Sequence, residues 1–370
     1  MRRLLLLLLV IGVGVAGGLL PMATAQAKPK PATPAIRHIF VINLENTSYD
    51  ETFGAASPAP YLSKELTAKG QLLSQYFATG HVSLSNYITQ ISGQGPSKTT
   101  QVDCATYSDF VATGTGDLGQ VLGDGCVYPA SVKTIADQLT AKHLTWRGYM
   151  EDIGNSATEP KTCRHPAIGG PDPTLAARPG DMYATRHNPF VYFHSIIDTP
   201  TCAKNVVGLD ALTADLAKPK TTRNLSYITP NLCHDGHDHP CVDGQPGGLV
   251  SADAFLGEWV PKILASKAFK KDGLLVVTFD ESEIGADSSD CCGPTPTPNV
   301  EQPGIQGPGG GRVGAVIVSP FVKPGTTSDT PYNHYALLCS MEDAFGLSHL
   351  GLAGRPGLQC FGNDVYNKKT

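Results

Sequence analysis

Acidic and amide side chains directly follow two apolar runs of the sequence. Glu45-Asn46 follow the first run, and Asp280-Glu281 follow a later one. Adjacent acids after a buried run repel each other and lose solvation unless a cation or hydrogen-bond donors compensate. Carboxylate and amide oxygens are hard ligands that suit Ca, Mg or Mn and also accept Zn. These four residues are therefore candidate ligands of one divalent metal ion, and a solvated acidic turn is the alternative.

Histidines follow two other apolar runs. Residues 234–239, between Cys233 and Cys241, hold three histidines and two aspartates. His234 and Asp235 are nearest to the preceding run, so we weight them above the later histidines as catalytic candidates. The alternative is a surface metal-binding tract without a catalytic role. His334, after the last apolar run, is a further site candidate.

A nucleophile is expected in the segment from His81 to Asn86. Ser83 stands before a helix-like stretch that ends at Gly93. A hydroxyl at a helix N-terminus lies in a positive potential, which favours a bound phosphate and the deprotonated hydroxyl. Ser85 competes for the same role. An ordinary serine N-cap is the alternative to both.

Short apolar runs alternate with helical stretches along the chain, which predicts how these residues are positioned. Strands are expected over 36–44, 226–229, 274–279 and 313–319, and helices over 131–142, 252–266 and 335–346. Continuous apolar runs indicate strands covered on both faces. The pattern predicts an α/β fold with a doubly wound, mostly parallel sheet flanked by helices. In such sheets ligands bind beyond the carboxyl ends of the strands, where the polar residues above are expected to meet.

Two Gly-rich regions, 94–128 and 282–312, interrupt the alternation and are expected to be long loops. The second is expected to form either a wall of the site or a disordered insertion. The ten cysteines indicate disulfides. Connectivity is not deducible, although near-neighbour pairs are preferred: 104–126, 163–202, 233–241 and 339–360. Adjacent Cys291 and Cys292 are expected to have separate partners.

The N-terminal residues have the parts of a signal peptide: Arg2 and Arg3, an apolar run over 4–20, and cleavage signatures near Ala25 or Ala27. A membrane anchor is the alternative. The expected organisation is a signal peptide over 1–27, a Pro-rich tether over 28–35 and a single domain over 36–370. The mature protein is expected to be secreted, without a transmembrane segment. The net charge of −5 and the scattered basic residues indicate no nucleic-acid partner.

Several motifs together resemble the bacterial phosphoesterase family of secreted acid phosphatases and phospholipases C. They are the segment 41–46, the run 274–281, the blocks 311–313 and 319–321, and the segments 333–335 and 342–346. The sequence is most similar to compact secreted acid phosphatases, including phosphatidylinositol 3-phosphate phosphatases. The resemblance implies an alkaline-phosphatase-like fold with a metal site and a Ser or Thr nucleophile.

The resemblance also implies roles for individual residues. Ser83 and Asn86 match a Thr-x-Pro-Asn pattern of related nucleotide pyrophosphatases, although Ser85 stands where the pattern has proline. Metal ligands would be Glu45, Asn46, Asp280 and Glu281. His234 and Asp235 would contact phosphate or donate a proton, and His81, Asn86 and His334 would contact the substrate. The expected function is a metal-assisted phosphatase that cleaves phosphate monoesters, or phospholipid head groups, through a serine phospho-enzyme. Its rivals are a phospholipase C-type phosphodiesterase and a non-catalytic, metal-binding surface protein.

Overall fold

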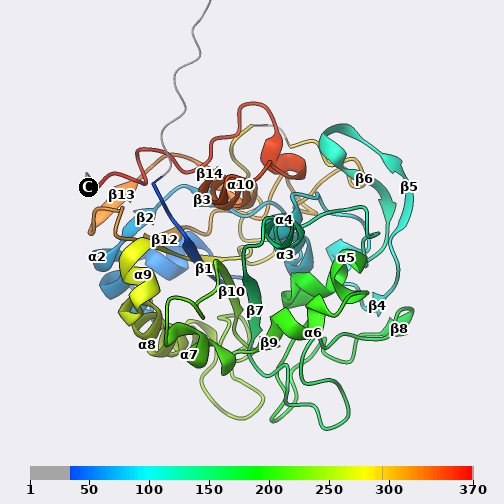
Figure 1. The fold of residues 1–370 in the computed structure, drawn as a ribbon, viewed down its shortest axis with the longest axis horizontal. Coiled ribbons are helices and arrows are strands. Elements are labelled where there is room, and N and C mark those ends of the chain that lie inside the picture. Colours follow the sequence, from blue (N-terminus) through cyan, green and yellow to red (C-terminus); the bar gives the residue numbers. More distant parts are fainter. Residues whose placement is uncertain (1–33, 294, 369–370) are drawn as a thin grey trace, which may run out of the picture. The chain divides into compact units, whose positions relative to one another are not determined.

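A computed structural model describes residues 34–293 and 295–368. The predicted signal peptide lies outside these residues and stays a prediction. Within them, an eight-stranded sheet has the order β13-β2-β12-β11-β1-β10-β7-β9 (Figure 1). The bounds are β1 His38–Leu44, β2 Gln71–Leu73, β7 Trp146–Met150, β9 Val206–Gly208, β10 Leu225–Thr229, β11 Gly273–Phe279, β12 Ala315–Val318 and β13 Thr326–Ser328.

The sheet is mostly parallel, as the sequence predicts. Strands β11, β1, β10, β7 and β9 run parallel, whereas β12 is antiparallel to both β11 and β2. Every residue of β10 and β11 is buried, which explains their continuous apolar runs. The α/β class and all four expected strands are confirmed; the short strands β2, β7, β9 and β13 were not predicted.

Helices cover both faces of the sheet. Figure 1 shows α3, α4 and α10 together on one side and α7, α8 and α9 on the other. The longer helices are α3 Ser83–Ser92, α4 Ile135–Ala141, α8 Gly248–Ala265 and α10 His334–Phe345; the shorter ones are α1 Tyr49–Phe53, α2 Thr67–Lys69, α5 His194–Ile197, α6 Thr201–Asn205, α7 Ala211–Leu216 and α9 Lys267–Asp272. None of the described helices is long and apolar enough to cross a bilayer.

The two Gly-rich regions differ from each other. Region 94–128 was expected to be a loop, but it contains an antiparallel hairpin of β5 Val111–Thr115 and β6 Val121–Asp124. Two further small sheets pair β3 Tyr76–Phe77 with β14 Tyr332–Asn333, and β4 Thr106–Tyr107 with β8 Gly170–Pro171. The described part of 282–312 contains neither helix nor strand, as expected.

Five disulfides link the ten cysteines, and the four near-neighbour pairs preferred from the sequence are confirmed. The expectation of separate partners for Cys291 and Cys292 is wrong, because these two residues bond to each other. Cys292 adopts a left-handed backbone with φ of 71°, so a turn brings the two adjacent side chains together. The pair Cys233–Cys241 closes the histidine-rich loop at the end of β10.

Candidate active site

Strand register brings the predicted acids together. Leu44 pairs with Phe279 at the ends of β1 and β11, and the backbone N–H of Asp280 donates to the carbonyl of Leu44 at 2.8 Å. Glu45 and Asp280 therefore leave the same sheet edge side by side. The backbone N–H of Glu45 also donates to the carbonyl of Asp235 at 2.8 Å, which draws the loop after β10 into the same place.

Ser83 lies against these acids. It is the first residue of α3, and its Oγ donates a hydrogen bond of 2.8 Å to Glu45 Oε2. Burial raises the pKa of Asp280 and of Glu281 as well, and repulsion between the two acids adds to the rise at Asp280. Ser85, in contrast, donates to the carbonyl of Val82 at 2.8 Å, as a helix-turn serine does.

The acidic cluster is almost without solvent. Glu45, Asp235, Asp280 and Glu281 are each exposed by 1% or less. Burial raises the pKa of Glu45 first, and repulsion from Asp280 and Asp235 adds to it. Burial likewise raises the pKa of Asp235, to about 7. Such a cluster is costly without nearby positive charge.

The donor set fits a hard divalent cation. Asp280 Oδ2, Glu281 Oε1 and Asp235 Oδ2 are buried and accept no hydrogen bond from the described residues. The side-chain amide of Asn46 lies between Glu45 and Asp280, where its nitrogen donates to Glu45 Oε2 at 2.9 Å and to Asp280 Oδ1 at 3.3 Å. Carboxylate and amide oxygens are the ligands that Mg, Ca and Mn prefer.

Three predicted substrate-binding residues have their polar atoms engaged by the protein. His81 contacts Glu281 through Nδ1 and the carbonyl of Asp287 through Nε2 at 3.0 Å. Burial lowers the pKa of His81 and raises that of Glu281, which fits a neutral pair sharing one proton. His334 Nε2 donates to the carbonyl of Asp280 at 2.6 Å, and its Nδ1 accepts from the hydroxyl of Tyr76 at 3.0 Å.

Asn86 is the third of these residues. Its Oδ1 accepts from the backbone N–H groups of Thr79 and Gly80 at 3.1 and 3.0 Å and from the Thr79 hydroxyl, and its Nδ2 donates to the carbonyl of Gly80 at 2.8 Å. In this structure Asn86 fixes the turn before the α3 N-terminus. Its predicted contact with phosphate stays a prediction.

The histidine-rich loop presents His237, rather than His234, beside the cluster. His234 Nδ1 lies 3.0 Å from both carboxylate oxygens of Glu151. The backbone N–H of His237 donates to Asp235 Oδ1 at 3.0 Å. Hydrogen bonding of the His237 ring to the acceptor carboxylate of Asp238 raises the pKa of His237 to about 9, although burial opposes it. His237 also lines a pocket of about 280 Å³ together with Asn46 and Glu283.

The structure adds residues that the sequence did not indicate. His187 is almost fully buried, with Nε2 3.3 Å from Glu45 Oε2 and Nδ1 3.7 Å from Asp235 Oδ2. Its ring stacks on Tyr87, whose hydroxyl donates to Glu45 Oε1. His187 does not directly follow a strand, so a search for polar residues at strand ends does not identify it. The only local signal is the pair Arg186-His187 shortly before Pro189, at the start of an apolar segment.

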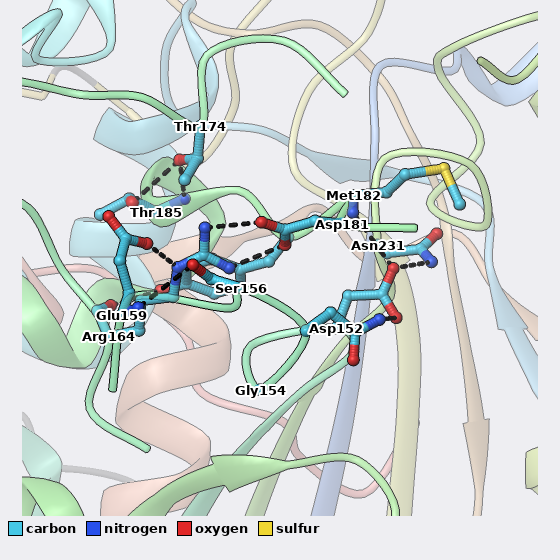
Figure 2. A network of polar contacts seen from close by, with 12 residues as sticks. Asp152, Gly154, Ser156, Glu159, Arg164, Thr174, Asp181, Met182, Thr185 and Asn231 are labelled. Carbon is cyan, nitrogen blue, oxygen red and sulfur yellow. Dashed lines mark hydrogen bonds and ion pairs between the residues drawn. The ribbon is translucent and has the colours of Figure 1, made fainter. Parts of the chain in front are cut away.

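The loop 282–312 braces the nucleophile segment. The carbonyl of Pro303 accepts from His81 N at 3.0 Å, and Ala78 N donates to Gly311 at 2.9 Å. Farther away, Arg164 bonds to Asp181, and Asp152 bonds to Asn231, as Figure 2 shows. The Arg164–Asp181 pair joins two parts of segment 152–182, and the Asp152–Asn231 bond connects this segment to the start of the histidine loop.

Comparison with known proteins adds family evidence. Residues 56–348 match the model of the Phosphoesterase family. A phosphate-repressible acid phosphatase from Penicillium chrysogenum is 28% identical over 83% of this chain and 58% of its own length. A phosphatidylinositol-3-phosphatase from Mycobacterium tuberculosis is 25% identical over 87% of this chain and 81% of that protein. The chain spans about three fifths of the length of the fungal acid phosphatases it matches.

Solved structures share the fold at low identity. A structure from Bacteroides thetaiotaomicron, described in connection with the metabolism of glycosaminoglycans, has a TM-score of 0.51 and 13% identity over 90% of this chain and 82% of that one. A protein of the alkaline phosphatase superfamily from Vibrio parahaemolyticus has a TM-score of 0.49 and 13% identity over 91% of this chain and 74% of that one. The first of these likenesses supports the α/β fold and nothing beyond it.

Proposed function

Because the chain belongs to the Phosphoesterase family, we propose that it is a metal-assisted phosphatase that hydrolyses phosphate monoesters through a phosphoserine at Ser83. The observation that carries this proposal is the contact of the Ser83 hydroxyl with Glu45 inside a buried cluster of carboxylates. Glu45 can accept the proton of this serine, and the backbone N–H groups at the N-terminus of α3 can bind the phosphoryl oxygens.

Glu45, Asn46, Asp280 and Glu281 would hold the metal, whose identity among Ca, Mg, Mn and Zn stays open. Bound there, a divalent cation supplies Lewis-acid stabilisation of negative charge on the phosphoryl group and favours the deprotonated serine. This role is supported by the buried carboxylate oxygens that accept no hydrogen bond from the described residues.

The chain's own residues carry the proton transfers. Ser83 Oγ forms a bond to phosphorus while the ester bond to the leaving group breaks, and the Ser83 proton passes to Glu45 Oε2, which already accepts it in a hydrogen bond. His237 gives its proton to the departing alkoxide. Water then attacks the phosphoserine and the bond from phosphorus to Ser83 Oγ breaks. The proton held by Glu45 returns to Ser83 Oγ, a proton of the attacking water passes to His237, and orthophosphate is released. We assign this acid role to His237 in place of His234, which Glu151 holds.

Mutation of the two serines tests the nucleophile. We expect Ser83→Ala to reduce kcat on p-nitrophenyl phosphate by at least about 10⁴-fold, comparable to the loss of other nucleophiles. Ser85→Ala is the matched control, because its hydroxyl only bonds within the turn, and it is expected to keep most activity. Phosphate trapped on the wild type at acidic pH and absent from Ser83→Ala would support the phosphoserine. Wild-type turnover by Ser83→Ala, with loss in Ser85→Ala, would refute the assignment.

Phosphoinositides are a proposed substrate class, because one relative is named a phosphatidylinositol-3-phosphatase. A phospholipase C-type phosphodiesterase is the alternative for the same centre, and rates on a monoester and on a choline phosphodiester separate the two. Measurable turnover of either substrate excludes a non-catalytic metal-binding surface protein. We also propose that the protein is secreted, since five disulfides accompany the signal-like N-terminal sequence.

A further inference from the structure

Arg186 reaches the first turn of the nucleophile helix. It lies in a 3₁₀ turn over Thr185–His187, and its Nε is 3.4 Å from Asp103 Oδ2. Asp103 Oδ1 in turn accepts from the backbone N–H of Leu84 at 3.0 Å. Leu84 is the residue after Ser83, so two short contacts connect the guanidinium to the nucleophile's own turn.

The guanidinium keeps donors free while its position is fixed. Nη1 donates to the carbonyls of Thr174 and Leu175 at 3.4 and 3.2 Å. Within the described residues, 34–293 and 295–368, no group accepts a hydrogen bond from Nη2. The side chain of Arg186 is only 11% exposed. A buried cation with spare, directed N–H groups is suited to a second anionic partner.

The turn that carries Arg186 is itself anchored. The backbone N–H of Thr185 donates to Thr174 Oγ1 at 2.8 Å, and Thr174 Oγ1 donates to Asp172 Oδ1 at 2.7 Å. Figure 2 shows Thr174 and Thr185 facing each other across this contact. The next residue, His187, projects between Glu45 and Asp235. The hydrogen bonds to Thr174 and Asp172 therefore fix the turn, and the contacts of the neighbouring His187 set it beside the acidic cluster.

Charge explains why the site needs this cation. Burial alone would lower the pKa of Arg186, but Asp103, Glu45 and Asp235 raise it, so the group stays protonated. A phosphate monoester brings up to two negative charges toward these carboxylates, whereas a diester brings one. The repulsion is greater for the monoester, and a guanidinium that bonds to non-bridging oxygens offsets it.

We propose that Arg186 binds the non-bridging oxygens of the phosphoryl group and makes the site favour monoesters over diesters. This inference rests on the proposed function, which it deepens by naming the residue that sets the substrate class. The competing explanation is that Arg186 only neutralises Asp103 and keeps that loop folded.

Arg186→Gln, Arg186→Lys and the exposed control Arg178→Gln test the inference. We expect Arg186→Gln to lower kcat/KM for p-nitrophenyl phosphate by roughly 10- to 100-fold, the value of one or two charge-assisted hydrogen bonds. Hydrolysis of bis-p-nitrophenyl phosphate is expected to fall less, so that the monoester-to-diester ratio drops. Arg186→Lys keeps the charge without the planar fork and is expected to be intermediate. Arg178→Gln is expected to match the wild type.

Binding of orthophosphate provides a readout that needs no turnover. We expect added orthophosphate to raise the melting temperature of the wild type and of Arg178→Gln, and to have a smaller effect on Arg186→Gln. Arg186→Gln that melts earlier but binds orthophosphate with wild-type affinity, at an unchanged monoester-to-diester ratio, would identify a counter-ion for Asp103 and overturn the inference alone. A wild-type protein with neither turnover nor orthophosphate binding would overturn the proposed function and this inference together.

Discussion

Replacing Asn86 by alanine separates a structural role from a substrate contact. The amide makes four hydrogen bonds to the turn at Thr79–Gly80, and all of these groups are buried. Each bond contributes about 1 kcal/mol net, and buried groups left without a partner cost more. We expect Asn86→Ala to lower the free energy of unfolding by about 3–5 kcal/mol. At about 2 °C per kcal/mol for a large domain, the melting temperature falls by roughly 6–10 °C.

Two variants sharpen this prediction. Asn86→Asp keeps the oxygen that accepts three of the four bonds but turns its second oxygen toward the carbonyl of Gly80, so the loss is expected to be smaller, about 1–3 kcal/mol, only at acidic pH, where the carboxyl group is protonated and can donate. Asn155→Ala removes an exposed amide that bonds only to Asp152 and is expected to change stability by less than about 0.5 kcal/mol. Thermal unfolding measured by circular dichroism, with KM and orthophosphate inhibition in parallel, gives the comparison.

An Asn86→Ala variant that melts with the wild type while its KM and its inhibition constant for orthophosphate rise together would refute the structural role. That result would make the amide a substrate ligand, as the sequence pattern suggested, and the hydrogen bonds at the turn incidental. If Asn86→Ala melts at a lower temperature but the enzyme that stays folded keeps the wild-type KM, Asn86 acts by fixing the segment that carries Ser83.

Two further predictions concern the buried carboxyl groups. Chelation of the metal is expected to lower the melting temperature, because oxygens of Asp280 and Glu281 then lack a counter-charge. Adding the metal back is expected to restore the melting temperature. Identical melting of the chelated and reloaded protein would show that these residues bind no metal. Burial raises the pKa of Glu342 to about 9, so between pH 4.5 and 9 the folded state holds a proton that the unfolded chain has released. The unfolding free energy therefore falls as pH rises in this window, and Glu342→Gln is expected to flatten that slope by up to about 1.4 kcal/mol per pH unit in denaturant titrations; an unchanged slope would contradict the assignment.

The acids were predictable because they follow strands directly. A parallel sheet brings the carboxyl ends of its buried strands to one edge, so an apolar run followed by Glu45 or Asp280 indicates both a strand and a position in space. The same rule placed Asp235 correctly at the end of β10, where its carbonyl accepts from Glu45 N.

The cationic side of the site was not predictable in this way. Arg186 and His187 lie on a 3₁₀ turn that reaches the cluster only through tertiary packing, by way of Thr174 and Asp172. The local periodicity of the sequence does not indicate these tertiary contacts. Distance along the chain from a strand end does not say which histidine of the loop faces the acids, because Gly236 has a φ of 113° and redirects the chain between His234 and His237.

The two histidines of that loop give opposite expectations for leaving-group protonation. His237 N caps Asp235, its ring lines the pocket beside Asn46, and a raised pKa of about 9 keeps it protonated at neutral pH. We expect His237→Ala to lose roughly 10²- to 10⁴-fold in kcat on an alkyl phosphate such as glycerol phosphate, the usual contribution of a general acid. In the phosphorylation step the loss is expected to be much smaller on p-nitrophenyl phosphate, because that phenolate departs with little need for a proton, whereas hydrolysis of the phosphoserine is slowed equally for both substrates.

His234→Ala is the matched control from the same disulfide-closed loop. Its ring pairs with Glu151, so its removal is expected to cost stability and to leave the ratio of alkyl to aryl rates unchanged. If His234→Ala shows the leaving-group dependence and His237→Ala does not, the acid is the histidine nearest the strand end, and the loop must rearrange when substrate binds. Equal losses in the rate of phosphorylation by both substrates, in both variants, would mean that neither ring donates the proton, since in that step a general acid acts only on the leaving group.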